Sequence, residues 1–246
     1  MRHFPLSDFV TEYALAFGLE VAEGNPFHLL KNGKPFTPKS FPYRFAHLPI
    51  STVPKNTFHL LEEERFTHPS FSIKEKKTFV VDVEKDFFFD EQVVKRMKKF
   101  PKSAEFLVLP ALEESLPLLE GTAKRKGYFD EKEWPCLVRL WKGLEKKGRI
   151  TSWGIRENGE WKAVQLMVEG SDGWAFTYFV GTHPETRPWS TWLMVKILEQ
   201  YRELGFKKVD LLGANLPTVA QFKKSFGGQM TTYLEFNRKP WWRRLL

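Results

Sequence analysis

The sequence predicts a mixed α/β (α+β) fold, in which helices flank a mostly antiparallel, twisted sheet. Two observations support this prediction. The pair Asn158-Gly159 separates two apolar runs and is typical of the tight turn of a β-hairpin. Further along the chain, an amphipathic stretch at 190–204 joins apolar runs at 174–180 and 207–212. Strands joined through a helix of this length are parallel, so one parallel pair is expected in the sheet.

Residues 1–84 show a different pattern. The segment is rich in Phe and Pro, and its short candidate strands are separated by turn signals such as Asn32-Gly33. Because a few short strands are rarely stable alone, the segment should pack against the rest of the chain. We therefore expect a small β-rich segment at 1–84 and a main domain at 85–246.

The main domain is expected to begin with helices and to end with a helix and a strand. The first helix ends before Pro101, and the next one has Pro117 in its first turn or is kinked by it. A third helix ends at Gly148. After the hairpin and the crossover, Gly227-Gly228 separates a last helix from a last strand. The expected helices lie at 89–99, 113–126, about 131–147, 190–204 and 216–226, and the expected strands at 106–109, 150–155, 161–168, 174–180, 207–212 and 230–236.

The chain is basic, with a formal charge of +8 and an isoelectric point near 9.4. This balance favours anionic partners such as nucleotide phosphates, tRNA, acidic glycans or anionic lipid. Basic residues gather at 95–99, at 124–126 and in the tail at 238–244. Each group is either a solvated surface or a binding surface. The tail also contains Trp241 and Trp242, a composition that suits peripheral contact with lipid headgroups.

Cysteine usage and hydropathy indicate a compartment. Cys136 is the only cysteine, which excludes an internal disulfide. The N-terminus has no apolar run of signal-peptide length, and no run is long enough for a transmembrane segment. We expect a cytoplasmic protein. The histidines are isolated from other ligand-type residues, so no metal site is expected.

Three segments carry a resemblance to a known family. The stretch 179–187 ends in a Pro-Glu-Thr-Arg loop, and 219–228 contains the run Phe-Lys-Lys-Ser-Phe-Gly-Gly. More loosely, 78–83 reads as the strand that enters such a domain. Together they resemble the GNAT acyltransferase superfamily, and within it the Fem-like branch that includes peptidoglycan aminoacyltransferases. The resemblance covers about residues 78–236.

The resemblance implies a GNAT-like sheet and the transfer of an acyl or aminoacyl group from an activated donor to an amine. The implied donors are acyl-CoA or aminoacyl-tRNA, and the implied acceptor is a small molecule or a peptidoglycan precursor with an amine. Fem-like proteins usually contain two GNAT-like domains, so residues 1–84 would be a remnant of the first one.

The donor loop departs from the GNAT pattern. Where that family has a glycine-rich run after the loop, this chain reads Pro188-Trp189-Ser190-Thr191-Trp192. Proline lacks an N–H donor and tryptophan fills the space that glycine leaves empty, which argues against conventional acyl-CoA binding. Ser190 and Thr191 either cap the following helix or present amides to an anion.

Two residues are candidates for catalysis. Lys223 occupies the Phe-Lys position of the Fem-like run, and the resemblance implies that its ammonium stabilises an oxyanion or protonates a leaving group. Alternatively, Lys223 is a surface lysine beside Lys224. Asp210 lies in an apolar strand, where a carboxylate needs a partner. It orients an amine nucleophile or accepts its proton, or else it pairs with Arg187 or caps a loop.

The expected donor-binding residues lie at the ends of the two parallel strands. Backbone N–H groups at Phe179, Val180 and Gly181 would polarise the donor carbonyl. The remaining expected contacts are Arg187, Ser190, Thr191 and Asn215, and Asn215 is also expected to cap the last helix.

These patterns support two hypotheses of function. The first is an N-acyltransferase of the kind described above. The second is a non-catalytic binding protein on a degenerate GNAT scaffold, in which Trp189 and Trp192 block the donor groove.

Overall fold

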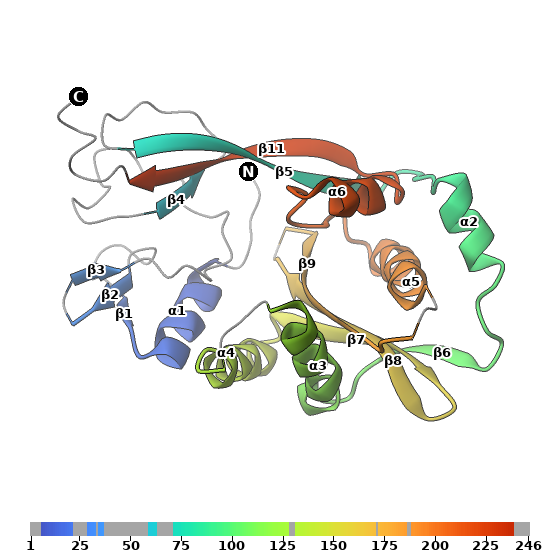
Figure 1. Ribbon diagram of the computed structural model, residues 1–246, viewed down its shortest axis with the longest axis horizontal. Coiled ribbons are helices and arrows are strands. Elements are labelled where there is room, and N and C mark those ends of the chain that lie inside the picture. Colours follow the sequence, from blue (N-terminus) through green and yellow to red (C-terminus); the bar gives the residue numbers. More distant parts are fainter. Residues whose placement is uncertain are drawn as a thin grey trace.

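The computed structural model describes most of the main domain and parts of the N-terminal third (Figure 1). The described residues are 6–21, 29–32, 34–36, 59–62, 71–127, 131–170, 172–185 and 188–238. Within them, eight strands form one sheet in the order β4-β11-β5-β10-β9-β8-β7-β6. These strands are β4 (His59–Glu62), β5 (Phe71–Asp82), β6 (Ala104–Val108), β7 (Ile150–Glu157), β8 (Glu160–Glu169), β9 (Trp174–Thr182), β10 (Lys208–Asp210) and β11 (Gln229–Arg238).

The expected mixed, mostly antiparallel sheet is confirmed. Among the described strands, the one parallel pair joins β9 and β10, while β10 pairs antiparallel with β5. Asn158 and Gly159 turn the chain between β7 and β8 with φ of 54° and 81°, values that Asn and Gly tolerate best. The strand expected to run to residue 212 ends at Asp210 instead, because Leu212 and Gly213 adopt φ of 49° and 32°, which strands do not contain.

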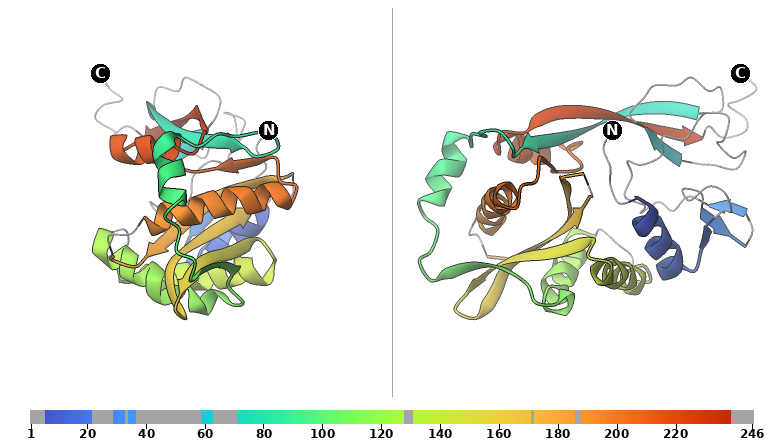
Figure 2. Two further views of the ribbon diagram at one scale, coloured as in Figure 1. Left: turned by 90° about the vertical axis from the view of Figure 1, so that its right-hand side faces the viewer. Right: turned by 180° about the vertical axis from the view of Figure 1, so that it is seen from behind.

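Helices cover both faces of the sheet (Figure 2). On one face lie α2 (Glu91–Met97), α5 (Trp189–Glu203) and α6 (Pro217–Lys224), which share a buried core with Ala175 of β9. On the other face lie α3 (Leu116–Lys126) and α4 (Trp134–Lys146), which share a second core with Phe176. Because neighbouring residues of a strand point to opposite faces, the two cores meet along β9.

The N-terminal third contributes a small sheet of β1 (Glu20–Val21), β2 (Leu29–Lys31) and β3 (Lys34–Phe36). It also contains a helix that sequence analysis missed, α1 (Leu6–Phe17). Phe9 and Tyr13 of α1 are fully buried in the core beside α4. Their spacing by four residues places both side chains on one helix face, which explains why this segment is helical.

The boundary expected between residues 84 and 85 stays a prediction. The structure adds one fact about it. Strand β5 precedes that boundary, yet it lies between β10 and β11 and pairs with β11 from Val80↔Gln229 to Phe71↔Arg238.

Candidate functional site

The two parallel strands separate part of the way along β9. Strand β10 pairs only with Trp174–Phe176, and β9 continues to Thr182. On its other side β9 carries a bulge, because Leu166 of β8 is opposite Phe179 while Met167 is opposite Thr177. A bulge bends its strand and increases its twist. The bulge therefore bends β9 near the point where its pairing with β10 ends.

Helix α3 packs directly against the end of β9. A Cβ atom on Gly181 would lie 2.6 Å from the backbone carbon of Leu118, so only glycine allows this approach. The Thr182 N–H donates to the Thr122 hydroxyl at 2.9 Å, and the Arg125 guanidinium donates to the Thr182 carbonyl. The Gln165 side chain donates to the Phe179 carbonyl at 2.9 Å. The expected carbonyl-binding stretch, Phe179 to Gly181, thus lies on a firmly held strand end.

Asp210 is fully buried at the end of β10. Its Oδ1 atom accepts hydrogen bonds from the Thr78 hydroxyl at 2.5 Å and from the Leu212 N–H at 2.8 Å. Because Thr78 belongs to β5, the carboxylate joins β10 to its antiparallel neighbour and fixes the first turn of the loop after β10. These contacts provide the partners that sequence analysis required for a buried carboxylate.

Lys223 of α6 holds the same loop from the other side. Its ammonium donates to the backbone carbonyls of Leu211 and Leu212, and to that of Gly213 at 2.9 Å. An ammonium has three N–H donors, and the loop provides an acceptor for each. The structure therefore brings the two expected catalytic residues together, since both bind Leu212, and both contact the protein's own backbone.

The helix N-caps that the sequence predicted for α5 and α6 are wrong. Asn215 lies before α6, but the N-cap residue is Leu216, and the Asn215 side chain accepts from the Lys77 N–H of β5 at 2.9 Å. The reason is that the loop after β10 runs along β5, where an unpaired backbone donor is available. Ser190 and Thr191 lie inside the first turn of α5, whose N-cap residue is Pro188.

Three of the first four residues of α5 are buried, and Ser190 is half-buried. Trp189, Thr191 and Trp192 are 1%, 2% and 2% exposed. The Thr191 hydroxyl accepts from Arg96 at 3.1 Å, and the Trp192 indole N–H donates to the Arg96 carbonyl at 2.7 Å. Arg187 lies outside the described residues.

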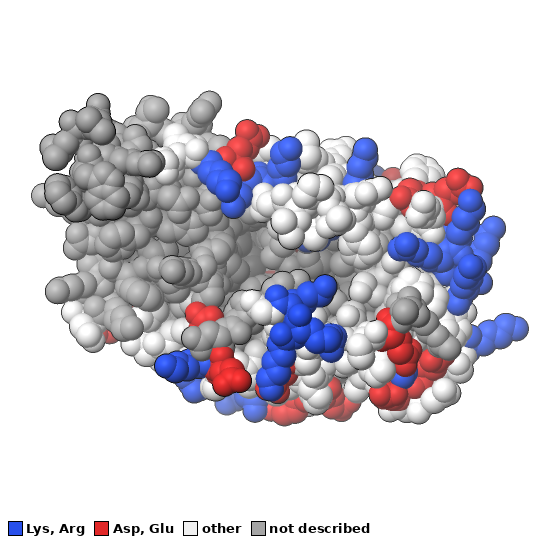
Figure 3. Space-filling view, in the orientation of Figure 1, with Lys and Arg blue, Asp and Glu red and all other residues white. Residues whose placement is uncertain are grey.

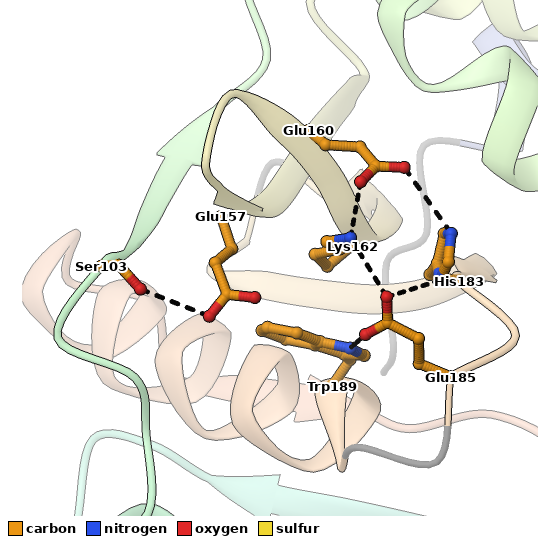
Figure 4. A network of polar contacts seen from close by, with 7 residues as sticks. All are labelled: Ser103, Glu157, Glu160, Lys162, His183, Glu185 and Trp189. Atoms are coloured by element: carbon orange, nitrogen blue, oxygen red, sulfur yellow. Dashed lines mark hydrogen bonds and ion pairs between the residues drawn. The ribbon is translucent and has the colours of Figure 1, made fainter.

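A charged network holds the loop between β9 and α5 (Figure 4). The Lys162 side chain of β8 is only 9% exposed, and its Nζ atom lies 2.6 Å from Glu160 and 3.2 Å from Glu185. His183 lies 3.2 Å from Glu185 and 3.6 Å from Glu160. The indole N–H of Trp189 donates to the other Glu185 oxygen at 3.4 Å.

The network shifts the ionisation of its members. The hydrogen bond and charge of Lys162 lower the pKa of Glu160, and the hydrogen bond from Lys162 is also the main cause that lowers the pKa of Glu185. In turn, the hydrogen bond to Glu160 raises the pKa of Lys162. Sequence analysis missed this network. The available signal was a lysine within the apolar run of β8, because such a lysine needs carboxylate partners.

The surface is hollowed between α6 and α3 (Figure 3). Basic side chains border this hollow on the side of α3 (Figure 3), and the last turn of α3 contains Lys124, Arg125 and Lys126. Lys124 pairs with Glu120 at 2.8 Å, and Arg125 is engaged with β9. This surface carries net positive charge beside the end of β9.

The site can be compared with known proteins. A family model for the acetyltransferase (GNAT) domain matches residues 97–224, which is more than half of the chain. The chain belongs to the GNAT acetyltransferase domain family. The matched residues include β9, α5, β10 and α6, so the separating strands are part of the GNAT domain. The comparison with curated proteins gives no match.

Solved structures show the same fold. FemX matches with a TM-score of 0.54 and 10% identity over 64% of this chain and 61% of its own. L-PGS from Bacillus licheniformis matches with a TM-score of 0.52 and 14% identity over 69% and 62%. The C-terminal domain of a putative lysylphosphatidylglycerol synthetase from Agrobacterium fabrum matches with a TM-score of 0.51 and 11% identity over 72% and 64%. The chain thus spans less than two thirds of each, and these likenesses show a shared fold.

Two features are absent from the described part of the chain. It contains no group of three His, Cys, Asp or Glu side chains placed to hold a metal ion. It also contains no helix that is both long and apolar enough to cross a bilayer. The basic tail beyond residue 238, which sequence analysis connects with lipid headgroups, lies outside the described residues.

Proposed function

We propose that this GNAT domain transfers an acyl or aminoacyl group from an activated donor to an amine, at the end of β9 beyond β10. The observation that carries the proposal is the separation of these strands after Phe176. A strand that continues past its neighbour presents backbone N–H groups along that edge. Such donors polarise a carbonyl where charge develops during acyl transfer.

The reaction needs positioning more than side-chain chemistry. The amine nitrogen attacks the donor carbonyl carbon, the bond from that carbon to the carrier breaks, and the amine proton leaves with the carrier. Holding both reactants in line supplies much of the rate acceleration. In this proposal Asp210 and Lys223 are positioning residues, because they fix the loop at 211–213 and thereby keep β10 away from β9.

The donor is proposed to be an aminoacyl ester on a nucleic-acid carrier rather than acyl-CoA. A diphosphate binds well to open N–H groups at a helix N-terminus. Here Trp189, Thr191 and Trp192 fill most of the first turn of α5 and are buried, and the Glu185 carboxylate contacts the first residue of the helix. The basic last turn of α3, by contrast, suits a polyanionic carrier. The proposed acceptor is an amine of a peptidoglycan precursor or of another small molecule.

Turnover with defined donors tests this proposal. Purified full-length protein is incubated either with a mixture of aminoacyl-tRNAs or with acetyl-CoA, together with peptidoglycan precursors, and products are identified by mass spectrometry. We expect an aminoacylated amine with the first donor. Lys126→Glu should weaken tRNA binding by at least the contribution of one phosphate contact. Lys102→Glu, which changes an exposed lysine away from the hollow, should leave tRNA binding unchanged. If only acetyl-CoA gave a product, the donor assignment would be wrong. If neither donor gave a product, the proposed transferase activity would be wrong.

A second candidate is a non-catalytic binding protein on the same fold. The observation that favours it is the engagement of both Asp210 and Lys223 with the protein's own backbone. Binding of aminoacyl-tRNA without turnover in the same assay would select this candidate.

A further inference from the structure

A second concave site lies away from β9, between α2 and α6. These helices form the walls of a pocket of about 310 Å³, a volume within the range of small-molecule sites. Gln92, Val93 and Arg96 line it from α2, and Thr218, Gln221 and Phe222 line it from α6.

The walls of this pocket are fixed relative to each other. The Asp90 N–H donates to the Ser225 carbonyl at the end of α6 at 2.9 Å. Gly227, with φ of 79°, comes so close to the chain before α2 that a Cβ atom there would lie 2.6 Å from the Phe88 carbonyl oxygen. Further along α2, the Arg96 carbonyl accepts from Trp192 of α5. A preformed pocket costs little ordering entropy when a ligand binds.

Arg96 supplies a positive charge at the pocket. Its Nη1 atom donates to the Thr191 hydroxyl at 3.1 Å, which orients the guanidinium. In the part of the chain that the structure describes, no carboxylate lies within ion-pair distance of Arg96, whereas the neighbouring Lys95 pairs with Glu91 at 2.7 Å. The Asp90 carboxylate also lines the pocket, but it caps α2 by accepting from the Val93 N–H at 2.9 Å. The exposed Lys98 and Lys99 follow directly after α2 and add positive charge near its end.

The rest of the lining is suited to an apolar group. Val93 is 2% exposed and Phe222 is half-buried, so together they form an apolar floor. Gln92, Gln221 and Thr218, whose side chains can donate and accept hydrogen bonds, also line the pocket. An aromatic ring placed on Phe222 would leave an attached anionic group within reach of the Arg96 fork.

We propose that the pocket between α2 and α6 binds a small organic anion that carries an aromatic or apolar group, with Arg96 as its anchor. The site is not a general property of the GNAT domain, because most of α2 precedes the matched residues 97–224. The lining of the pocket includes neither the end of β9 nor the loop after β10, where the transfer reaction is proposed.

Three probe molecules distinguish recognition of the anionic group from recognition of the aromatic ring. Phenyl phosphate has both a ring and an anion, inorganic phosphate has only the anion, and phenol has only the ring. Each is titrated into ¹⁵N-labelled full-length protein, and the side-chain signals of Gln92, Gln221 and Arg96 are followed by NMR. We expect saturable shifts of these signals with phenyl phosphate, and binding at least about tenfold weaker for each single-feature probe, because a charge-assisted hydrogen bond and a buried ring each contribute more than a factor of ten.

Matched variants test the anchor. Arg96→Gln should weaken phenyl phosphate binding about tenfold or more, whereas Lys99→Gln, which removes the same charge from beside the same helix, should change it less than twofold. Gln221→Glu places a carboxylate on the opposite wall without breaking a hydrogen bond, and it should weaken binding even if Arg96→Gln disturbs folding. Equal losses for Arg96→Gln and Lys99→Gln, shifts spread over all basic surfaces, or no saturation with phenyl phosphate would each overturn the proposal.

Discussion

Strands β9 and β10 are parallel neighbours, so the loops that follow them start at the same end of the sheet. A lysine side chain holds each of these two loops in place. Lys162 binds the first loop through the carboxylate of Glu185, while Lys223 binds the second through backbone carbonyls. Carbonyls keep their acceptor ability at every pH, whereas carboxylates lose it when they are protonated. The loop after β10 is therefore held regardless of acidity, and the loop after β9 is held only while its carboxylates are ionised.

The largest expected effect comes from the close approach of α3 to β9. Gly181→Ala should lower the free energy of unfolding by about 3 kcal/mol, because the new methyl group meets backbone atoms that cannot rotate away. Gly121→Ala, within α3 itself, should instead leave stability unchanged or raise it by up to about 1 kcal/mol, since its Cβ meets only a side-chain end at 3.4 Å. Urea denaturation measures both, and equal effects would show that the end of β9 is not tightly packed.

Removal of the ammonium at the second loop should have the next largest effect. Lys223→Met leaves the carbonyls at 211–213 without their donor and should cost about 2 kcal/mol of unfolding free energy. Lys224→Met, an exposed neighbour on α6, should stay within about 0.5 kcal/mol. If Lys223→Met abolished turnover while stability was unchanged, the lysine would act in the chemistry instead of positioning the loop.

Acid should weaken the first loop but not the second. Because Lys162 lowers the pKa of Glu160 and Glu185, their ion pairs stabilise the fold fully above the ordinary value of 4.5 and lose this contribution as pH falls toward the lowered pKa. Glu185→Gln should therefore be less stable than the wild type at pH 7, and the difference should shrink below pH 4.5. The cost of Lys223→Met should stay constant over the same range. Urea melts at several pH values check both trends, and a parallel decline in the two variants would refute the comparison.

The smallest effect is expected where the second loop passes β5. Asn215→Ala removes the acceptor for the Lys77 N–H, but water can replace it because this contact is exposed. The expected cost is about 0.5 kcal/mol in the same denaturation experiment. A cost above that of Lys223→Met would mean that the β5 contact, not the lysine, determines the course of the loop.

Local signals in the sequence predicted much of this fold. The Asn158-Gly159 turn, the helix at 189–203 and the parallel pairing of β9 with β10 all depend on neighbouring residues or on one crossover, and all are confirmed. Helix α1 was missed because short candidate strands dominated the interpretation of its surroundings, although Phe9 and Tyr13 already had helical spacing.

The candidate site was less predictable because its contacts span long distances along the chain. Asp210 was recognised as needing a partner, but nothing near it indicated Thr78, which lies 132 residues away. In the same way, Lys223 was selected from a motif, and its role depends on where the loop after β10 turns. Residue types could indicate that these side chains matter, and only the fold shows what they contact.

The position of β5 has a practical consequence for anyone who expresses part of this protein. A fragment that starts at residue 85 keeps every matched GNAT residue, yet it lacks the strand that separates β10 from β11. The facing edges of β10 and β11 would then lack a strand to pair with, and unpaired strand edges promote aggregation with other chains. A recombinant GNAT fragment of this chain should therefore begin upstream of Phe71.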